Sequence, residues 1–590
     1  MTITYTDLIR ETFINPLRSV TIIDDQYPTW EDWLQGYAFK DKTDQTLNSI
    51  QNKSWENPDK IKSRIDELRN QKLIIDIHDG NEEESRINYY HHSDLVILDY
   101  QLEGQNGDGK KSIEIAQKLL TENSHFNLIV LHTQEDNDRL LTPFSNILLK
   151  LMGKPEKLNS KLIDQGDELI DEFEIQNRLN SAFTLQHYLT IRIHDFKYFK
   201  NGLLDKTLQA RYPIFSELTS IVHEYKMNHQ QVAMLLTSIC NKIAHNSEEN
   251  FSDENAPGLK WSSSEILWIK TDKGFIAFTS KKSDKLFIDV LLTALTDWQP
   301  TPSRMISGKI RNLLHVQGAE FEDKFLHQDH IGWLFYKTFN SDKSKNKISL
   351  VTSELNRQME RYSDLIHSGI QDFANKILLT DSKEDNGQPS KFEKMYQFEA
   401  ENIMIARDNY NSFVSCKPHA SEHLTPGNIL CHGDNIWIVV TPSCDLVPNQ
   451  KISNTTPNFI KFTAAKLHKR KIADVREEAN TGNIIFLKNS INNDEISCYS
   501  IYGAPEAGFN ERYLTQKIFL AQNRGEFTKA EQKYTVTAFS EKENPIDNRL
   551  EFEEITFTLH HQQLRYEYAL NLLSKIGIHA SRIGLDYISK

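Results

Sequence analysis

The sequence predicts a multi-domain α/β protein, with a parallel sheet near the N-terminus, a helical and α+β middle, and a β-rich C-terminal domain. At 590 residues the chain is too long for one hydrophobic core and suggests three or four domains. Before residue 134, short apolar runs each end in a polar side chain. Helical periodicity follows from about residue 159, and short strand-like runs dominate from residue 391 onward.

The apolar runs of the N-terminal part deliver polar side chains to the ends of expected strands. In chain order, Asp24 and Asp25 follow the run 19–23, Asp99 ends the run that begins at 94, Thr133 ends the run that begins at 126, and the dipeptide Lys154-Pro155 stands 21 positions later (154 − 133 = 21). Open α/β sheets form their sites at the carboxyl ends of the strands. We therefore expect these groups to meet in one crevice.

Three carboxylates in one crevice would raise one another's pKa unless a cation offsets their charge. Hard oxygen ligands of this kind suit Mg²⁺. Phosphoryl transfer needs a nucleophile, a metal ion, a fixed cation and a hydrogen-bond donor. Asp99, the pair Asp24 and Asp25, Lys154 and Thr133 would fill these roles.

These residues, in this order, resemble the receiver domain of bacterial two-component response regulators over about residues 16–158. The resemblance implies a flavodoxin-like fold within residues 1–158 and transfer of a phosphoryl group from a histidine kinase onto Asp99. It also implies Mg²⁺ held by Asp24, Asp25, Asp99 and the carbonyl of Gln101. The alternative is an α/β domain whose strand-end acids cap neighbouring helices.

Two features depart from the receiver pattern. Asp99 follows Asp25 by 74 residues (99 − 25 = 74), and the excess is expected as an insertion around the first helix, at about 30–70. Long surface insertions cost little loop entropy, so the core can still close. Many receivers carry an aromatic switch residue three positions before the lysine, and the residue there is Leu151.

Composition limits the other functions. The net charge of −14 argues against a broad nucleic-acid surface, and the basic cluster 466–471 is expected on a solvated helix face. The mean hydropathy is −0.55, and no apolar stretch approaches the length of a membrane span. The N-terminus resembles no secretory signal, and five irregularly spaced cysteines favour a reducing compartment. We expect a cytoplasmic protein.

The middle of the chain is expected to contain a helical module at 159–258 and an α+β module at 259–380, which opens with a hairpin at 265–279. The helical module either relays a signal through a homodimer or simply packs on the receiver. Its segment 240–246 resembles the signature of HEPN ribonucleases, but Cys240 stands where that family needs an arginine beside Asn241 and His245.

Beyond a linker at 381–390, residues 391–590 are expected to form a closed SH3-like barrel with a C-terminal helix at 560–576. It contains the motif Cys444-Asp445-Leu446. Three readings remain open: a zinc site, a Cys444 nucleophile activated by His432 and Asp445, or buried small residues. The zinc ligands would come from Cys416, His419, His423, Cys431, His432 and Cys444.

Two functions fit the sequence. The first is a phosphoacceptor without effector chemistry, acting as an adaptor or a phosphate sink. Such a chain is similar to the receiver proteins of bacterial two-component anti-phage systems such as Detocs, which implies a histidine kinase and a second, receiver-fused effector as partners. The alternative is an effector enzyme, a nuclease or hydrolase activated by phosphorylation, with its active site in residues 159–590.

Overall fold

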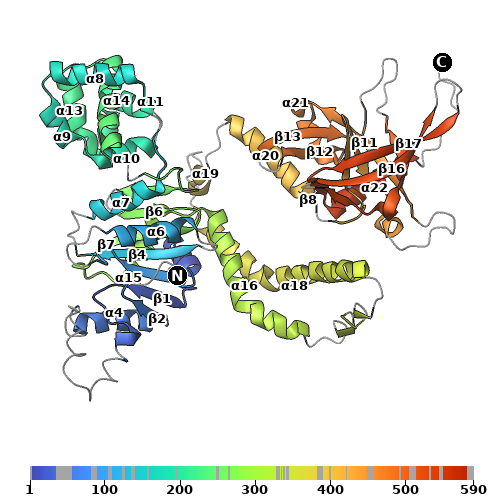
Figure 1. The fold of residues 1–590 in the computed structure, drawn as a ribbon, viewed down its shortest axis with the longest axis horizontal. Helices are drawn as coiled ribbons and strands as arrows, with labels where there is room; N and C mark the ends of the chain where they lie inside the picture. Colours follow the sequence, from blue (N-terminus) through green and yellow to red (C-terminus); the bar gives the residue numbers. More distant parts are fainter. Residues whose placement is uncertain are drawn as a thin grey trace. The chain divides into compact units, whose positions relative to one another are not determined.

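The computed structural model divides into two compact units, Met1–Tyr396 and Gln397–Lys590 (Figure 1). The structure describes residues 3–32, 34, 56, 58–80, 90–103, 109–122, 126–134, 140–155, 158–193, 196–247, 251–263, 266–326, 332–333, 335–336, 339–340, 344–381, 390–396, 400–419, 421–447, 458–490, 493–503, 513–530, 533–543 and 549–580. In these residues, no helix combines the length and the apolar character that crossing a membrane requires.

A seven-stranded sheet organises the first unit. Its order is β2-β1-β3-β4-β7-β6-β5, in which the first five strands pair in parallel, whereas the β7–β6 and β6–β5 pairings are antiparallel. The strands are β1 (Ser19–Ile23), β2 (Ile74–His78), β3 (Leu95–Asp99), β4 (Asn127–Thr133), β5 (Lys260–Ser263), β6 (Leu267–Lys270) and β7 (Gly274–Ser280). The parallel part has the 2-1-3-4-5 order of flavodoxin-like sheets, with β7 as the fifth strand.

Helices cover both faces of this sheet, and each central strand therefore buries both of its faces. In β3, Leu95 and Ile97 pack on one face, while Val96 and Leu98 pack on the other. The first face carries α1 (Tyr5–Ile9), η1 (Arg10–Ile14), α4 (Pro58–Asn70) and α15 (Phe287–Trp298); the second carries α6 (Lys110–Thr121) and α7 (Leu141–Leu151). Parallel strands that are covered on both sides read as continuous apolar runs, as seen in the sequence.

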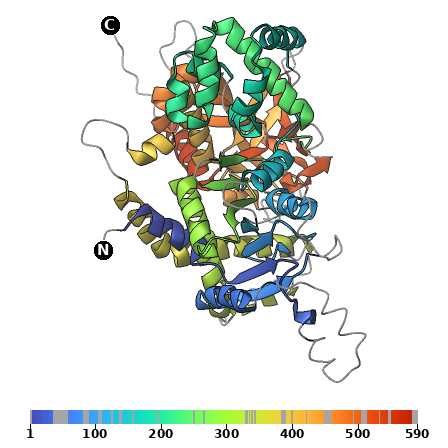
Figure 2. The same ribbon diagram turned by 90° about the vertical axis from the view of Figure 1, so that its left-hand side faces the viewer.

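The helical module is inserted within the sheet domain rather than placed after it. It comprises α8 (Ser160–Glu172), α9 (Gln176–Ala182), α10 (Leu185–Ile193), α11 (Phe196–Leu204), α12 (Thr207–Arg211), η4 (Pro213–Phe215), α13 (Ser216–Glu224) and α14 (His229–Asn246). These helices form one cluster in both views (Figures 1 and 2) and share a continuous core with α6 and α7. The chain then returns to the sheet through β5, β6 and β7.

This topology corrects two sequence-based boundaries. A domain that ends at residue 158 would lack the fifth parallel strand, and the expected hairpin at 265–279 is part of the same sheet instead of a separate α+β module. The insertion expected at about 30–70 is also shorter, because α4 is the crossover helix between β1 and β2. Most of the remainder, 35–55, lies outside the described residues, as does most of the expected linker at 381–390.

Two long helices follow the sheet. Helices α16 (Pro302–Leu326) and α18 (Ser344–Leu379) pack against each other, and α19 (Lys391–Met395) ends the unit. Glu11 of η1 anchors the pair, because its two carboxylate oxygens lie 2.7 Å from Lys309 Nζ and 2.9 Å from Lys376 Nζ.

The second unit contains a closed six-stranded ring, β10-β9-β17-β16-β14-β11, which closes through the β10–β11 pairing. Its elements are α20 (Ala400–Ser415), β8 (Cys416–Pro418), β9 (Ile429–His432), β10 (Asn435–Val439), η6 (Ser443–Leu446), β11 (Ile460–Arg470), α21 (Ile472–Val475), η7 (Arg476–Thr481), β12 (Ile484–Ser490), β13 (Asn493–Ser500), β14 (Gln516–Ala521), η8 (Gln522–Gly525), β15 (Thr528–Ala530), β16 (Lys533–Glu543), β17 (Leu550–Leu559), β18 (Gln562–Leu564) and α22 (Tyr566–Ala580). The expected closed barrel is present. That it belongs to the SH3-like class of barrels stays a prediction. The basic cluster at 466–471 lies mainly on strand β11, so the expected helix face was wrong.

Candidate functional site

Four polar side chains converge at the carboxyl edge of the parallel sheet. Asp24 follows β1, Asp99 ends β3, His132 is the penultimate residue of β4, and Lys281 follows β7. Side chains alternate along a strand, and each of the four lies two residues beyond a position on the α15 face of the sheet. Asp99 and His132 are also direct partners in the β3–β4 register. The strand pattern therefore brings these side chains onto one face.

Lys281 joins the two carboxylates. Its Nζ lies 2.9 Å from Asp24 Oδ2 and 2.9 Å from Asp99 Oδ2. His132 Nε2 lies 3.4 Å from Asp24 Oδ2. The side chains of Lys281, Asp24, Asp99 and His132 are only 5 %, 0 %, 2 % and 3 % exposed. The charges of the cluster are therefore held almost entirely away from water, where they interact strongly.

Burial and mutual charge set the protonation of this cluster. Burial, with the charge of Asp99 as the next cause, raises the pKa of Asp24 to about 7, although Lys281 opposes the shift. Burial also raises the pKa of Asp99, again opposed by Lys281. Burial by itself disfavours the charged ammonium of Lys281. The attraction of the carboxylates of Asp24 and Asp99 is larger, so the pKa of Lys281 is raised. Burial and the nearby Lys281 hold the pKa of His132 well below its usual value, so the imidazole is neutral.

Backbone groups fix the orientation of both carboxylates. The N–H of Gln26 donates to Asp24 Oδ1 at 2.9 Å, and the N–H of Gln101 donates to Asp99 Oδ1 at 3.3 Å. Asp25 is half-buried beside them, and its charge contributes to the raised pKa of Asp99. When all three carboxyls are ionised, three carboxylates against one ammonium leave two negative charges. A divalent cation fits this donor set, and the carbonyl of Gln101 as a further ligand stays a prediction.

Thr133 ends β4, next to His132, and is fully buried. Its backbone carbonyl accepts a hydrogen bond of 2.7 Å from the N–H of Lys281, which ties the end of β7 to the end of β4. Strand alternation directs its side chain to the opposite face from His132. The role of Thr133 as a phosphoryl-oxygen donor stays a prediction.

Lys154 does not lie at this site, and the expectation that it would was wrong. Its Nζ lies 3.1 Å from Asp253 Oδ1, and its side chain is 56 % exposed. Helix α7 starts after the carboxyl end of β4 and occupies residues 141–151, so Lys154 comes at the far end of the helix, before the chain has crossed back along the sheet. The lysine that reaches the carboxylates is Lys281, 148 residues after Thr133 (281 − 133 = 148).

Because the lysine at the site is Lys281 and not Lys154, the aromatic switch residue is to be sought three positions before Lys281. Three residues before Lys281 stands Phe278, which is buried and packs edge-on against Phe144 of α7, with ring centroids 5.4 Å apart. It is paired with Leu131 in the β4–β7 register, on the same face as Thr133. The aromatic residue missing at Leu151 is therefore present at Phe278. The apolar run 275–280 followed by Lys281 was the sequence signal that could have identified both residues.

The other candidate residues do not form a cluster of this kind. Cys416 is buried, and burial raises the pKa of its thiol to about 11. Cys444 is exposed beside Asp445, whereas His432 Nδ1 lies 3.1 Å from the carbonyl of Thr556. In the described part of the chain, the group Asp24, Asp99 and His132 is the one set of three or more His, Cys, Asp or Glu side chains close enough to share a metal ion. The zinc prediction thus gains no support from the described residues.

The segment that resembles the HEPN signature lies on α14. Cys240 is buried in the helical core, Lys242 Nζ lies 2.9 Å from Asp167 Oδ1, and His245 is exposed near the end of the helix. A lysine engaged with an aspartate provides no planar guanidinium beside Asn241. The structure adds no support for ribonuclease chemistry here.

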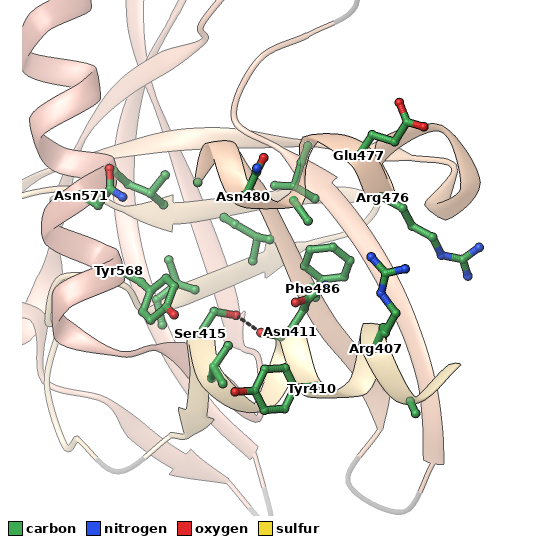
Figure 3. Close-up of a pocket in the computed structure, with 18 of the residues that line it drawn as sticks. Arg407, Tyr410, Asn411, Ser415, Arg476, Glu477, Asn480, Phe486, Tyr568 and Asn571 are labelled. Atoms are coloured by element: carbon green, nitrogen blue, oxygen red, sulfur yellow. Dashed lines mark hydrogen bonds between the residues drawn. The ribbon is translucent and has the colours of Figure 1, made fainter. Parts of the chain in front are cut away.

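The second unit contains a hollow of about 910 Å³ (Figure 3). Helices α20 and α22, η7 and β12 line it, with an apolar wall that includes Phe486. At its polar rim, Arg476 is held by Asp408, with a 2.8 Å distance between Arg476 Nη2 and Asp408 Oδ2. Ser415 Oγ donates to the backbone carbonyl of Asn411 (Figure 3). Cys444 and His432 lie outside its lining, so it does not contain the expected cysteine nucleophile.

Comparison with known proteins agrees with the geometry of the first site. Residues 16–180 match the family model described as the response receiver domain. No curated protein and no solved structure matches the chain. The match ends 94 residues before β7 begins (274 − 180 = 94), because the helical module separates the last parallel strand from the rest. Over residues 16–180, the N-terminal unit is therefore similar to response receiver domains.

Proposed function

We propose that Asp99 accepts a phosphoryl group from a phosphohistidine of a partner histidine kinase. The observation that carries the proposal is the contact of one buried ammonium, that of Lys281, with both Asp24 and Asp99 at 2.9 Å. This contact provides a fixed positive charge next to a strand-end carboxylate, as phosphoryl transfer requires. The receiver-domain match over residues 16–180 supports the same chemistry.

In the proposed step, a carboxylate oxygen of Asp99 attacks phosphorus. The phosphorus–nitrogen bond of the phosphohistidine breaks, and its electron pair leaves with the imidazole, which takes up a proton. Lys281 offsets the negative charge of the acyl phosphate, and the hydroxyl of Thr133 donates to a phosphoryl oxygen. Mg²⁺, when held by Asp24, Asp25, Asp99 and the Gln101 carbonyl, supplies further charge neutralisation.

The signal leaves the site through Phe278 in this proposal. Phe278 packs on Phe144 of α7, and α7 packs on α10 of the inserted module. A rearrangement of Phe278 on phosphorylation would therefore reach the module directly. Packed elements of this kind tend to have discrete alternative arrangements, which is how a small displacement becomes a signal.

At the level of the cell, we propose an adaptor or phosphate sink in a two-component pathway, with anti-phage defence as the setting that the sequence resemblance implies. The partners would be a histidine kinase and a receiver-fused effector that competes for its phosphoryl groups. The arrangement around Cys444 favours this role over a cysteine-dependent effector, because the thiol is exposed and His432 is bonded elsewhere.

Phosphoryl uptake from a small donor tests the proposal. The full chain, incubated with acetyl phosphate and Mg²⁺, should gain one acid-labile phosphoryl group, detected by intact mass. Asp99→Asn should abolish the gain. Asp76→Asn, which neutralises a largely exposed carboxylate on the neighbouring β2 strand, should leave it unchanged. Uptake that persists in Asp99→Asn would place the acceptor elsewhere and overturn the proposal.

A further inference from the structure

His132 places a neutral nitrogen inside the carboxylate cluster. Its Nε2 is buried, forms no hydrogen bond to any residue that the structure describes, and faces Asp24 Oδ2 at 3.4 Å. The ring edge packs on Phe287 of α15, with centroids 5.4 Å apart, which restricts the orientation of the imidazole. A buried nitrogen without a hydrogen bond costs free energy. A ligand that binds both this nitrogen and the neighbouring carboxylates would remove that cost.

A metal ion is such a partner. One ligand atom from each of Asp24, Asp99 and His132 lies within 4.8 Å of the other two. Bonds of about 2.0 to 2.2 Å to a shared ion allow two ligand atoms to lie up to about 4.4 Å apart. The 3.4 Å between His132 Nε2 and Asp24 Oδ2 is within this limit, and a separation near 4.8 Å requires a side chain to move by about 0.4 Å. Imidazole suits first-row transition ions, whereas Mg²⁺ prefers oxygen ligands.

We propose that His132 Nε2 is a ligand at the cation site of this receiver domain, together with Asp24 and Asp99, and that the site therefore selects a divalent first-row transition ion over Mg²⁺. The inference rests on the cation site of the proposed function. It adds a nitrogen ligand to that site and changes the class of ion.

Lys281 is compatible with such an ion. When Asp24, Asp25 and Asp99 are all ionised, three carboxylates and one ammonium leave a charge of −2, which a single divalent cation neutralises. Lysine presents a compact charge on a flexible stem with three donors. Its ammonium can therefore keep a hydrogen bond to one carboxylate oxygen while the ion takes another. The alternative is that His132 simply donates to Asp24, but 3.4 Å exceeds the usual 2.7 to 3.2 Å range for such a hydrogen bond.

The test uses Mn²⁺ as the probe on the full chain. Electron spin-echo modulation of the Mn²⁺-loaded wild type should show coupling to a directly bound ¹⁴N nucleus. His132→Gln and His132→Leu should lose that coupling and should lower the ratio of Mn²⁺ to Mg²⁺ affinity, measured by calorimetry, by at least about tenfold. His78→Gln is the matched control, because His78 ends the neighbouring β2 strand and its Nε2 lies 3.0 Å from Asp76. It should retain both properties.

Bound Mn²⁺ without ¹⁴N coupling in the wild type would overturn the inference, and this measurement does not depend on whether a His132 variant folds. An unchanged affinity ratio in a folded His132→Leu would overturn it as well. The outcome is independent of phosphorylation. Nitrogen-bound Mn²⁺ in a chain that takes up no phosphoryl group would support the inference and reject the proposed function, and the reverse pattern would do the opposite.

Discussion

The ammonium of Lys281 lies 2.9 Å from Asp99 Oδ2, although 182 residues separate the two in the chain. The separation arises because the helical module at 159–258 is inserted before the fifth parallel strand. The sheet restores the short distance, since β7 pairs with β4 in parallel and ends at the same edge. The site is therefore assembled by the strand order, across a long insertion.

Lys281→Met should lower the free energy of unfolding and weaken the response to phosphorylation, because it removes the cation between two buried carboxylates. Breaking a buried pair in this way costs on the order of 3 kcal/mol of unfolding free energy. Lys154→Met should change that free energy by less than about 0.5 kcal/mol, because the contact of Lys154 with Asp253 is exposed. Urea unfolding curves measure both. A larger loss in Lys154→Met would contradict the assignment.

Stability should fall as the pH rises towards 8 when chelator keeps metal ions away. The pKa of Asp24 is raised from the usual 3.8 to about 7 in the folded protein. Between these two pH values the folded protein therefore keeps a proton on Asp24, whereas the unfolded chain has released it. The stability that this carboxyl contributes is present below the lower value and is lost as the pH passes about 7.

Asp24→Asn removes this titration. We therefore expect it to raise the melting temperature at pH 8 and to change it little at pH 4. Asp76→Asn, at a largely exposed carboxylate, should have little effect at either pH. A melting temperature of Asp24→Asn that tracks the wild type across this range would show that Asp24 titrates near its ordinary pKa.

Phe278→Leu should separate phosphoryl uptake from signal output. The variant keeps the carboxylates and Lys281, so acyl-phosphate formation should match the wild type. Loss of the edge-on contact with Phe144 should remove the change in hydrogen exchange that phosphorylation causes in α7 (141–151). Phe275→Leu is the control, since Phe275 is buried on the other face of the same strand. A response that survives in Phe278→Leu would exclude this route.

Expression of Asp99→Asn beside the native kinase distinguishes a phosphate sink from an effector. If the chain is a sink, loss of Asp99 should release the kinase's other targets and slow growth without any trigger. Cys444→Ser and His432→Gln should leave growth unchanged, because neither residue takes part in a reaction. Unimpaired growth with Asp99→Asn, together with loss of protection, would reject the sink and favour an effector in residues 159–590.

The sequence predicted the elements whose signals are local. The strands that lead to Asp24, Asp99 and Thr133 could be predicted from short segments, because each apolar run and the polar residue at its end are adjacent in the chain. Lys281 was missed because its partner strand lies beyond an insertion whose length no local pattern encodes. The dipeptide Lys154-Pro155 offered a plausible spacing, but α7 takes up the residues that a returning strand would need.

His132 shows a different limit. Its position in the β4 run was visible in the sequence, but a histidine near a strand end is compatible with many environments. Only the register of β3 and β4 shows that it stands beside Asp99, and only the packing of Phe287 shows how its ring is held. The strand β11, expected as a helix face, was missed for a similar reason. Its alternating burial is partly hidden by the basic cluster at its end.

Chemical trapping of the phosphorylated residue tests the central claim most directly. Borohydride reduces an aspartyl phosphate to homoserine, and mass spectrometry of the digested protein then identifies the position. After incubation with acetyl phosphate and a divalent cation, the account predicts homoserine at Asp99 and at no other aspartate. Homoserine at Asp24 or Asp25, or a phosphoryl group on a residue that borohydride leaves intact, would contradict it.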